Sequence, residues 1–262
     1  MANAAGAVFA PDGILATHGD TRATFPLASL SKVLAAVTFH LATEEGTISL
    51  DDEAGPPGST VRHLLAHASG LPPDGDPTPL GPPANRRVYS NLGFEVLGSH
   101  LEERAGMSYA EYARAALVET LGLTGTELTG SPAHAHRSTV DDVCAVLASV
   151  VTHRLLAAPT VEAMTTPAFA DLAGVLPGFG KQDPNPWGLG VEVRGHKDPH
   201  WTSPHNSPRT WGHFGQTGTF VWFDPEAGTD GLGLVVLTDR DFGPWAIEAW
   251  PPLATAVLAD HS

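Results

Sequence analysis

The 262-residue chain contains little cysteine, few basic side chains and no long hydrophobic run. Its one cysteine, Cys144, excludes an intrachain disulfide framework. Only 14 Lys and Arg stand against 29 Asp and Glu, and the net charge of −15 argues against nucleic acid and anionic membranes as partners. No apolar run approaches the ~20 residues of a membrane span. The first residues lack the basic and apolar segments of a secretory signal, so we expect a cytoplasmic protein.

Hydrophobic patterning divides the chain into three zones. Residues 5–10 and 14–17 flank a Pro-Asp-Gly turn, which indicates a hairpin. Residues 29–166 are mostly helical in pattern, and residues 187–238 are rich in β-strand signals. Strands are expected at 187–194, 219–223 and 232–237, and a terminal helix at 244–259. Strands at both ends with helices between them predict an α+β fold with one sheet built from the two chain ends.

The first helix is the best defined. Apolar residues at Leu30, Val33, Leu34, Val37 and Leu41 lie on one helical face, and Gly46 ends the helix. Further helices are expected at 60–67, at 91–105, from a capping box at Ser108 to about 119, and from Ser138 onward. The Pro-rich segment 71–87 and the polar segment 195–210 are expected to be loops.

Ser29-Leu30-Ser31-Lys32 lies where an extended segment meets this first helix. A serine at a helix N-terminus has backbone N–H groups and the positive end of the helix dipole beside it, which favour the negative charge of acyl transfer. Lys32 lies three residues on, on the same face, and a buried lysine with a lowered pKa can accept the serine proton. Alone, the pattern is more often a helix cap followed by an exposed charge.

Two further segments gain meaning only in combination with the first. Tyr89-Ser90-Asn91 opens a helix after the Pro-rich loop. The segment 211–219, WGHFGQTGT, contains three glycines that allow one backbone to approach another group closely. Each alone is an ordinary turn.

In this order the three segments resemble the serine β-lactamase and penicillin-binding-protein superfamily, whose signature is S-x-x-K, a Ser or Tyr motif, and K-T-G. The Tyr-x-Asn form is similar to the class C β-lactamase-like branch, which includes esterases, D-aminopeptidases and DD-peptidases. Segment 61–72, VRHLLAHASGLP, and segment 187–190, WGLG, look like two other segments of that branch. The resemblance covers residues 5–250. It implies a β-lactamase/transpeptidase-like fold: an antiparallel sheet with flanking helices and a helical lobe. We expect a single domain over 1–262, its α/β part at about 1–50 and 187–262 and its helical part at about 51–186.

The resemblance also implies roles for individual residues. Ser29 would be the acylated nucleophile, and Lys32 and Tyr89 would share the proton transfers. Asn91 would hydrogen-bond Lys32 and the substrate. The substrate site would also include His213, Gly215 and Gln216, with the backbone N–H groups of Ser29 and Gln216 forming the oxyanion hole. Acylation and hydrolysis would need no cofactor and no metal.

The sequence departs from the family pattern in two places. His213 replaces the lysine of the third motif, and a histidine attracts a substrate carboxylate only when protonated. This favours ester or amide hydrolysis over β-lactam hydrolysis. The chain also opens almost directly into its first strand, where family members begin with a helix, so a truncated start remains an alternative.

Other candidate residues have simpler explanations. His63 and His67 have the i, i+4 spacing of a metal site, but no Glu follows His63, and we predict no metal. Solvated surface is the expectation for the remaining loop histidines: His134, His136, His196, His200 and His205.

Cys144 is expected to be a buried, inert thiol. Trp211 is close enough in sequence to His213 to line a cleft. Arg86 and Arg87 could meet an anionic substrate group, although solvated surface charges are the stronger expectation.

Two classes of function remain. One is a serine hydrolase acting on a small ester, amide or peptide, with a true β-lactamase or D-specific peptidase as variants. The other is a non-catalytic member that binds a ligand in the same cleft. Retention of Ser29, Lys32 and Tyr89 favours the enzyme. Specificity lies in loops such as 71–87 and 195–210, which leaves the substrate open, as is the oligomeric state.

Overall fold

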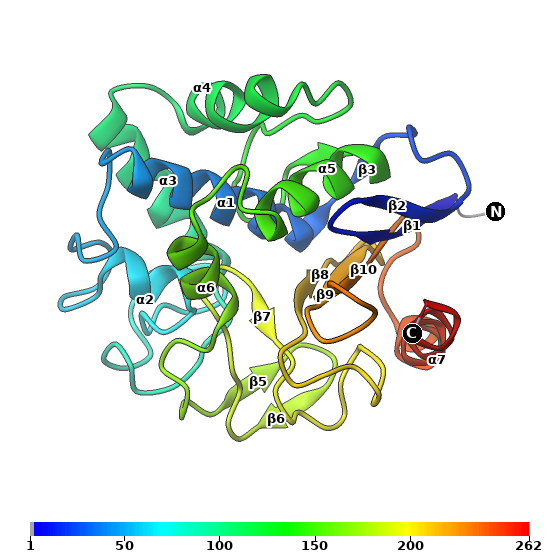
Figure 1. Cartoon of the computed structure of the whole chain (residues 1–262). Coiled ribbons are helices and arrows are strands. Elements are labelled where there is room, and N and C mark those ends of the chain that lie inside the picture. The colour runs from blue at the N-terminus through cyan, green and yellow to red at the C-terminus, as the bar shows by residue number, and fades with distance from the viewer. Residues whose placement is uncertain (1–2, 262) are drawn as a thin grey trace.

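Both ends of the chain contribute to one antiparallel sheet (Figure 1). The computed structural model describes residues 3–261, and within them the main sheet has six strands in the order β2-β1-β10-β9-β8-β7. These strands are β1 (Ala4–Ala10), β2 (Gly13–His18), β7 (Glu192–Val193), β8 (Trp211–Phe214), β9 (Phe220–Asp224) and β10 (Leu232–Thr238). The central pair joins the two ends, with Ala4 opposite Thr238 and Phe9 opposite Gly233.

The inner strands β1, β10 and β9 are buried on both faces because apolar residues occupy successive strand positions, which point to opposite sides, whereas the edge strand β2 is exposed. On β9, Val221 and Phe223 pack into the larger core cluster, whereas Phe220 and Trp222 pack into a second cluster with Trp250. The first face is covered by the internal helices and the second by the C-terminal helix (Figure 1).

The helices are η1 (Ala28–Leu30), α1 (Ser31–Glu44), α2 (Val61–Leu65), α3 (Asn91–Ala105), α4 (Tyr109–Ala113), η2 (Arg114–Glu119), α5 (Val140–Val151), α6 (Ala158–Thr165) and α7 (Pro244–His261). Helix α1 is central: every residue from Ser31 to Ala42 is buried. The sequence predicted one apolar face, but the helix is enclosed on all sides, with Thr38 satisfied by the Leu34 carbonyl. Its first turn is therefore held rigidly.

Two small sheets fix the segments around this helix. Strand β3 (Phe25–Pro26) pairs with β4 (Arg137–Ser138), and β5 (Gly174–Leu176) pairs with β6 (Gly180–Gln182). The β3–β4 pair is extended by the hydrogen bond from the Leu27 amide to the His136 carbonyl (2.9 Å). This pairing joins the segment that precedes η1 to the segment that precedes α5.

Several predicted elements are confirmed. The hairpin β1–β2 forms, α3 has the predicted bounds, and the Ser108–Glu111 capping box opens α4. Gly46 follows α1 with a positive φ of 74°, as a residue after a helix end commonly does.

The prediction of one strand over 187–194 is wrong, because only Glu192–Val193 is strand. The Gly188 amide donates to the Val191 carbonyl, and Gly190 has φ +113°, so the chain turns here. A Cβ on Gly190 would lie 2.2 Å from the Ala36 Cβ, so the glycine allows this turn to pack directly on α1. Strand β8 was missed, because its histidine and glycine were interpreted as part of a turn.

The segment 195–210 is a loop as predicted, and His196 and His205 are exposed, but His200 is buried, which corrects the expectation of solvated surface for that histidine. Lys197, His200 and Trp201 point inward and converge on Glu192. A carboxylate with three donors can be buried, and it draws the polar loop into the interior.

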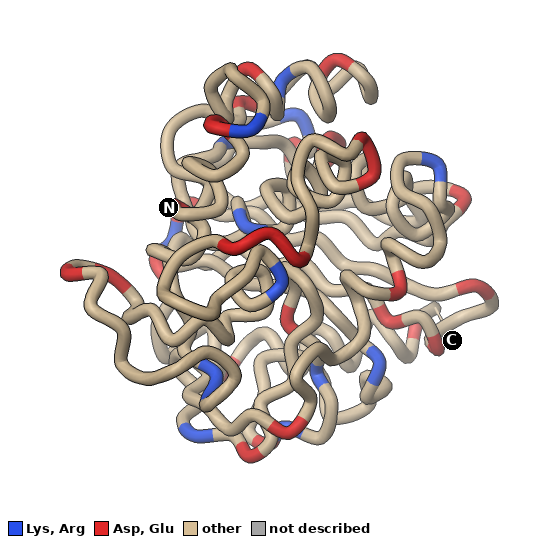
Figure 2. The backbone as a smooth tube through the Cα atoms, turned by 90° about the vertical axis from the view of Figure 1, so that its left-hand side faces the viewer, with Lys and Arg blue, Asp and Glu red and all other residues tan. Residues whose placement is uncertain are grey.

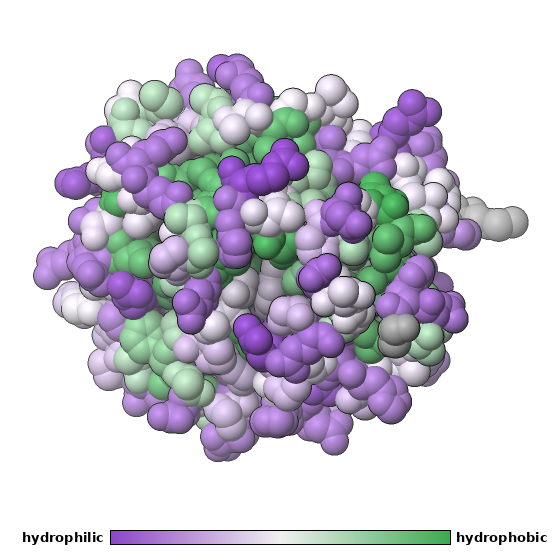
Figure 3. Space-filling model, viewed as in Figure 1, coloured by the Kyte–Doolittle hydropathy of each residue, from purple (hydrophilic) through white to green (hydrophobic). Residues whose placement is uncertain are grey.

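The surface of the molecule, on the side seen in Figure 1, is predominantly polar. Figure 2 shows acidic and basic positions distributed over loops and helices, and Figure 3 shows mainly hydrophilic side chains with smaller hydrophobic areas between them. Within residues 3–261 no helix has both the length and the apolar character needed to cross a membrane.

Candidate active site

Ser29 lies in the single turn η1, between β3 and the buried helix α1. The turn is closed by the Leu30 amide, which donates to the Leu27 carbonyl (3.1 Å). Ala28 has φ +47°, a left-handed conformation that costs a non-glycine residue about 1–2 kcal/mol. Ser29, which follows this strained residue, is only partly buried, whereas Leu30 and Ser31 after it are buried. Strain of this kind is often found at functional sites.

Lys32 lies directly behind Ser29 and is fully buried. Its Nζ is 3.4 Å from the Ser29 Oγ, 2.6 Å from the Asn91 Oδ1 and 2.8 Å from the Ala133 carbonyl oxygen. A neutral amine has two N–H donors and one lone pair. The amide oxygen and the carbonyl can accept both donors, which leaves the lone pair directed at the Ser29 hydroxyl.

The surroundings of Lys32 favour the neutral amine. Burial lowers the pKa of Lys32 from 10.5 to about 7, against the opposing effect of the Asp74 and Glu95 carboxylates. At neutral pH a large fraction of Lys32 is therefore able to accept a proton.

Tyr89 lies on the other side of Ser29, and its ring centroid is 4.8 Å from the Lys32 Nζ. Burial raises the pKa of the Tyr89 hydroxyl, and the nearby Ser29 side chain opposes this only in part. The two hydroxyls do not form a hydrogen bond of good geometry, and the buried Tyr89 oxygen has no partner within residues 3–261. A phenol in this position stays protonated and can relay a proton rather than hold a charge.

The third motif forms the opposite wall, at the turn from β8 to β9. Thr217 and Thr219 donate from their hydroxyls to the carbonyls of Pro26 and Leu27, both at 3.0 Å. Gly215 is needed because a Cβ there would lie 2.5 Å from the Leu27 oxygen. These contacts hold the turn against η1, so Gln216 and Ser29 line the same pocket.

His213 is buried on β8 and faces Tyr89, with 5.7 Å between ring centroids. Its Nδ1 lies 2.7 Å from the Phe214 carbonyl, which only accepts, so the Nδ1–H donates. Burial, aided by the Lys32 charge, lowers the pKa of His213 to about 3. The imidazole is therefore neutral near pH 7, and Nε2, its second nitrogen, can only accept a hydrogen bond.

The pocket at Ser29 has a volume of about 280 Å³. Its lining combines predicted and unpredicted residues: Ser29, Tyr89, Asn91, Leu176, Pro177, Trp187, Glu192, His213, Phe214 and Gln216. The apolar members are Leu176 on β5, Pro177 in the following turn, Trp187 of the WGLG segment and Phe214 on β8. A small, half-apolar pocket of this size suits a short acyl or amine group better than a long one.

Glu192 is the one carboxylate among these lining residues. Its Oε1 accepts from Lys197 (2.6 Å) and His200 (2.9 Å), and its Oε2 accepts from the Trp201 Nε1 (2.7 Å). Burial acts to raise the pKa of Glu192, but Lys197 and His200 lower it to about 2. The ion pair is buried, so its charges largely cancel beside the pocket.

The structure brings Ser29, Lys32, Tyr89, Asn91, His213 and Gln216 together, whereas Gly215 shapes the turn without lining the pocket. Sequence reasoning missed Glu192 and the Ala133 carbonyl, neither of which belongs to a motif. Trp187 also lines the pocket, and its place as the first residue of the WGLG segment was the one sequence signal for this role.

Other predicted candidates lie elsewhere. Arg87 is neither a substrate contact nor a surface charge: it is buried and donates to the carbonyls of Ala66, Ala168, Phe169 and Asn185. These four acceptors hold segment 168–185 against α2, and burial lowers the pKa of Arg87 to about 10.

The histidines and the cysteine are structural in their contacts. His63 Nδ1 bonds Thr60, and His67 Nδ1 accepts from the Ser90 amide. His136 is buried, contrary to the expectation of solvated surface, and burial lowers its pKa to about 3. Cys144 is buried as expected, and burial raises its pKa to about 12. The described part of the chain contains no group of three or more His, Cys, Asp or Glu that could hold a metal.

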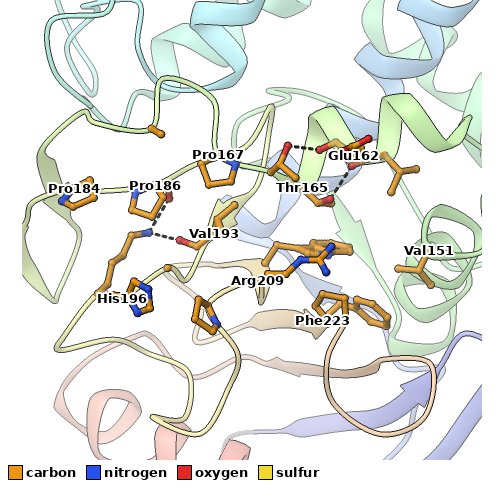
Figure 4. Close-up of a pocket in the computed structure, with 18 of the residues that line it drawn as sticks. Val151, Glu162, Thr165, Pro167, Pro184, Pro186, Val193, His196, Arg209 and Phe223 are labelled. Carbon is orange, nitrogen blue, oxygen red and sulfur yellow. Dashed lines mark hydrogen bonds between the residues drawn. The ribbon is translucent and has the colours of Figure 1, made fainter.

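A second cavity, of about 830 Å³, lies on the other side of β7 (Figure 4). Figure 4 shows α6 with Glu162 and Thr165 on one side and Arg209 with Phe223 on another. Trp211, expected beside the site of His213, lines this cavity instead. The two cavities share no lining residue, and the Glu192–Lys197 pair lies between them.

Comparison with known proteins agrees with this geometry. The family model described as "Beta-lactamase" matches residues 15–258, so the chain belongs to the β-lactamase family. A protein of Mycobacterium bovis, whose structure is described as that of a β-lactamase, is 48% identical, with a TM-score of 0.95 over 99% of this chain and 95% of that one.

More distant relatives share parts of the sequence or the fold. Penicillin-binding protein 4* of Bacillus subtilis is 29% identical over 140 residues, which cover 41% of this chain and 31% of that protein. A structure described as a hydrolase with promiscuous acyltransferase activity has a TM-score of 0.76 over 98% of this chain and 92% of that one. At 17% identity it shows a common fold alone.

Proposed function

We propose that the protein is a serine hydrolase of the class C β-lactamase-like branch that forms an acyl-enzyme on Ser29 and hydrolyses small esters or amides that carry no negative charge near the scissile carbonyl. The observation that carries the proposal is the buried Lys32 amine, 3.4 Å from the Ser29 hydroxyl with acceptors for its two N–H groups. A serine hydroxyl becomes a useful nucleophile only when an adjacent base takes its proton.

In the acylation step, the Ser29 oxygen attacks the substrate carbonyl as its proton passes to Lys32. The backbone N–H groups of Ser29 and Gln216 stabilise the resulting oxyanion. Tyr89 relays a proton to the leaving group, which departs as an alcohol or amine. Water then attacks the acyl-enzyme, and the same groups act in reverse to release the acid and regenerate Ser29.

The neutral state of His213 supports an ester or amide substrate. A substrate carboxylate would meet an imidazole whose one N–H already donates to the Phe214 carbonyl. The pocket is lined by no positively charged side chain among the described residues. Substrate anions therefore gain little from this site.

β-Lactam hydrolysis is the second candidate, favoured by the description of the 48%-identical relative as a β-lactamase. It requires that the carboxylate of the β-lactam be tolerated beside neutral His213 and Glu192.

The test combines labelling and turnover. A fluorophosphonate probe should add one adduct to the peptide containing Ser29, and Ser29→Ala should remove both the adduct and the turnover of a chromogenic butyrate ester. A chromogenic cephalosporin and a D-amino-acid anilide are assayed in parallel. Labelling that persists in Ser29→Ala would sink the mechanism, and a tenfold preference for the cephalosporin at pH 8 would establish the second candidate.

A further inference from the structure

Asp74, on the Pro-rich loop, does not itself line the pocket, but its hydrogen bond with the lining residue Asn91 places it at the rim. Two hydrogen bonds of the loop fix its position. The backbone N–H of Asn91 donates to the Pro73 carbonyl (2.8 Å), and the Ser90 hydroxyl donates to the Pro72 carbonyl (2.6 Å). The loop is thus attached to the first turn of α3, the helix that carries Asn91. An exposed acidic side chain on this loop is therefore held in place relative to the catalytic groups.

The side chain of Asp74 is directly linked to those groups. The Asn91 Nδ2 donates to the Asp74 Oδ1 (2.9 Å), while the Asn91 Oδ1 accepts from Lys32. A carboxylate only accepts, so the orientation of the Asn91 amide is fixed by both neighbours. The path from Asp74 to Ser29 is then three hydrogen bonds, through Asn91 and Lys32. Within residues 3–261 the second oxygen, Oδ2, accepts no hydrogen bond.

Asp74 forms no ion pair within residues 3–261, and Lys32, the amine linked to it through Asn91, is only partly charged near pH 7 because burial lowers its pKa to about 7. Glu192 is paired with Lys197, His213 is neutral, and Arg87 is turned into the interior with its donors occupied by carbonyls. The charge of the Asp74 carboxylate acts on the reacting groups. It raises the pKa of Lys32, which burial lowers, and it adds to the rise that burial causes in the pKa of Tyr89. When Lys32 is neutral, a substrate approaching Ser29 therefore meets one uncompensated negative charge.

Resting on the serine hydrolase proposed above, we propose that Asp74 is a specificity-determining residue that selects substrates carrying an ammonium group close to the scissile carbonyl, as in an aminoacyl ester or amide. The ammonium would pair with Oδ2 at the rim while the carbonyl lies at Ser29. Such a cation also favours the neutral form of Lys32, which is the form that accepts the serine proton. Asp74 is exposed and its pairing is screened by water, so the preference should be roughly threefold to fivefold rather than larger.

Three p-nitrophenyl esters test this charge selection. Their acyl chains have the same length and end in a tert-butyl, a trimethylammonium or a carboxylate group. The kcat/KM of each is divided by its rate of hydroxide hydrolysis, at low salt and at about 0.5 M NaCl. The cationic ester should exceed the neutral one roughly threefold to fivefold, the anionic ester should be the poorest, and added salt should reduce both differences.

Asp74→Asn keeps an acceptor for Asn91 but removes the charge, and it should bring the cation-to-neutral ratio close to one. Glu248→Gln is the matched control, because Glu248 is exposed on α7, which covers the far face of the sheet, and its replacement changes the net charge equally. The control should keep the wild-type ratio. If Asp74→Asn does not fold, the salt dependence of the wild-type ratio decides.

The role of Asp74 would be overturned by a cation-to-neutral ratio of one or less in the wild type, or by the same ratio in Asp74→Asn as in the wild type. In either case, continued ester turnover and Ser29 labelling would leave the proposed hydrolase intact. Preference for the anionic ester would likewise overturn the role of Asp74. Absence of both turnover and labelling would overturn the hydrolase, and this proposal with it.

Discussion

Raising the pH from about 6 to about 8 should increase the rate of Ser29 acylation roughly tenfold, through a single titration with a pKa of about 7. Burial lowers the pKa of Lys32 to that value, and Lys32 accepts the serine proton only as a neutral amine. One pH unit below this pKa, about one enzyme in eleven has neutral Lys32, and one unit above it about ten in eleven do. Activity therefore rises as the pH passes upward through the pKa.

The titrations of His213, His67 and Tyr89 lie outside this range. Burial holds the pKa of His213 at about 3 and that of His67 well below its usual value, and it raises that of Tyr89. Lys197, whose pKa burial lowers to about 8, lies behind Glu192 and does not touch Ser29. Its deprotonation would appear as a separate change on the alkaline side.

The assay measures kcat/KM for a neutral ester, and in parallel the rate of fluorophosphonate inactivation, from about pH 5.5 to about 9.5. Both should show the same acid limb, because both require deprotonation of Ser29. In Glu95→Gln the limb should move to lower pH, since the Glu95 carboxylate favours protonated Lys32. Glu248→Gln, on the exposed face of α7, should leave it in place.

Replacing Lys32 by arginine tests the same reasoning without a titration. Arginine keeps the positive charge but stays protonated, so acylation should fall by about 10³-fold or more. A flat profile between pH 6 and 8, or Lys32→Arg activity within about tenfold of wild type (~1.4 kcal/mol of barrier), would refute Lys32 as the base.

Three more predictions concern the walls of the pocket. His213→Lys should raise kcat/KM for a cephalosporin relative to a butyrate ester at pH 7; an unchanged ratio would mean that residue 213 does not meet the substrate carboxylate. Gly215→Ala should lower kcat/KM about 100-fold, because the new Cβ would lie 2.5 Å from the Leu27 carbonyl oxygen. Gly81→Ala is the control, because its Cβ would lie 3.4 Å from the Asn85 Nδ2, an ordinary contact, and it should leave kcat/KM unchanged. Equal activities of the two variants would contradict this reasoning. Lys197→Met should lower the free energy of unfolding by about 3–5 kcal/mol in urea titrations, and adding Glu192→Gln should restore part of it. A Lys197→Met protein as stable as wild type would show that the ion pair is not needed.

The fold could be predicted largely because its elements have local signals and its motifs occur in the family order. The α3 helix, with Ser90 as its cap, is an example: the Ser90 side chain accepts from the Gly93 amide (3.0 Å). The division into an α/β part and a helical part of one domain over 1–262 stays a prediction.

The remaining features depend on contacts between distant segments, which have no local pattern. Arg87 was predicted to be a solvated surface charge, as Arg86 was, because a charged pair in a polar loop is usually solvated. Its four carbonyl partners come from residues 66 and 168–185, which no local pattern connects to it. Likewise, nothing next to Glu192 indicates that Lys197, His200 and Trp201 would bury it. A strand prediction also failed at Gly190, where packing on Ala36 overrides the local preference.

The pairing of β1 with β10 has a consequence for the order of events in folding. Ala4 meets Thr238, so the central ladder of the sheet closes only after almost the whole chain is available. Contacts of such long range slow folding, because loop-closure entropy is lost before the pairing is gained. The turn after β8 and the first turn of α1 are both positioned by this sheet and its core. During synthesis, the helices between them can form early, but a competent nucleophile should appear only at the final, cooperative step. Refolding experiments should therefore recover esterase activity and Ser29 labelling together with the global transition, and not before it.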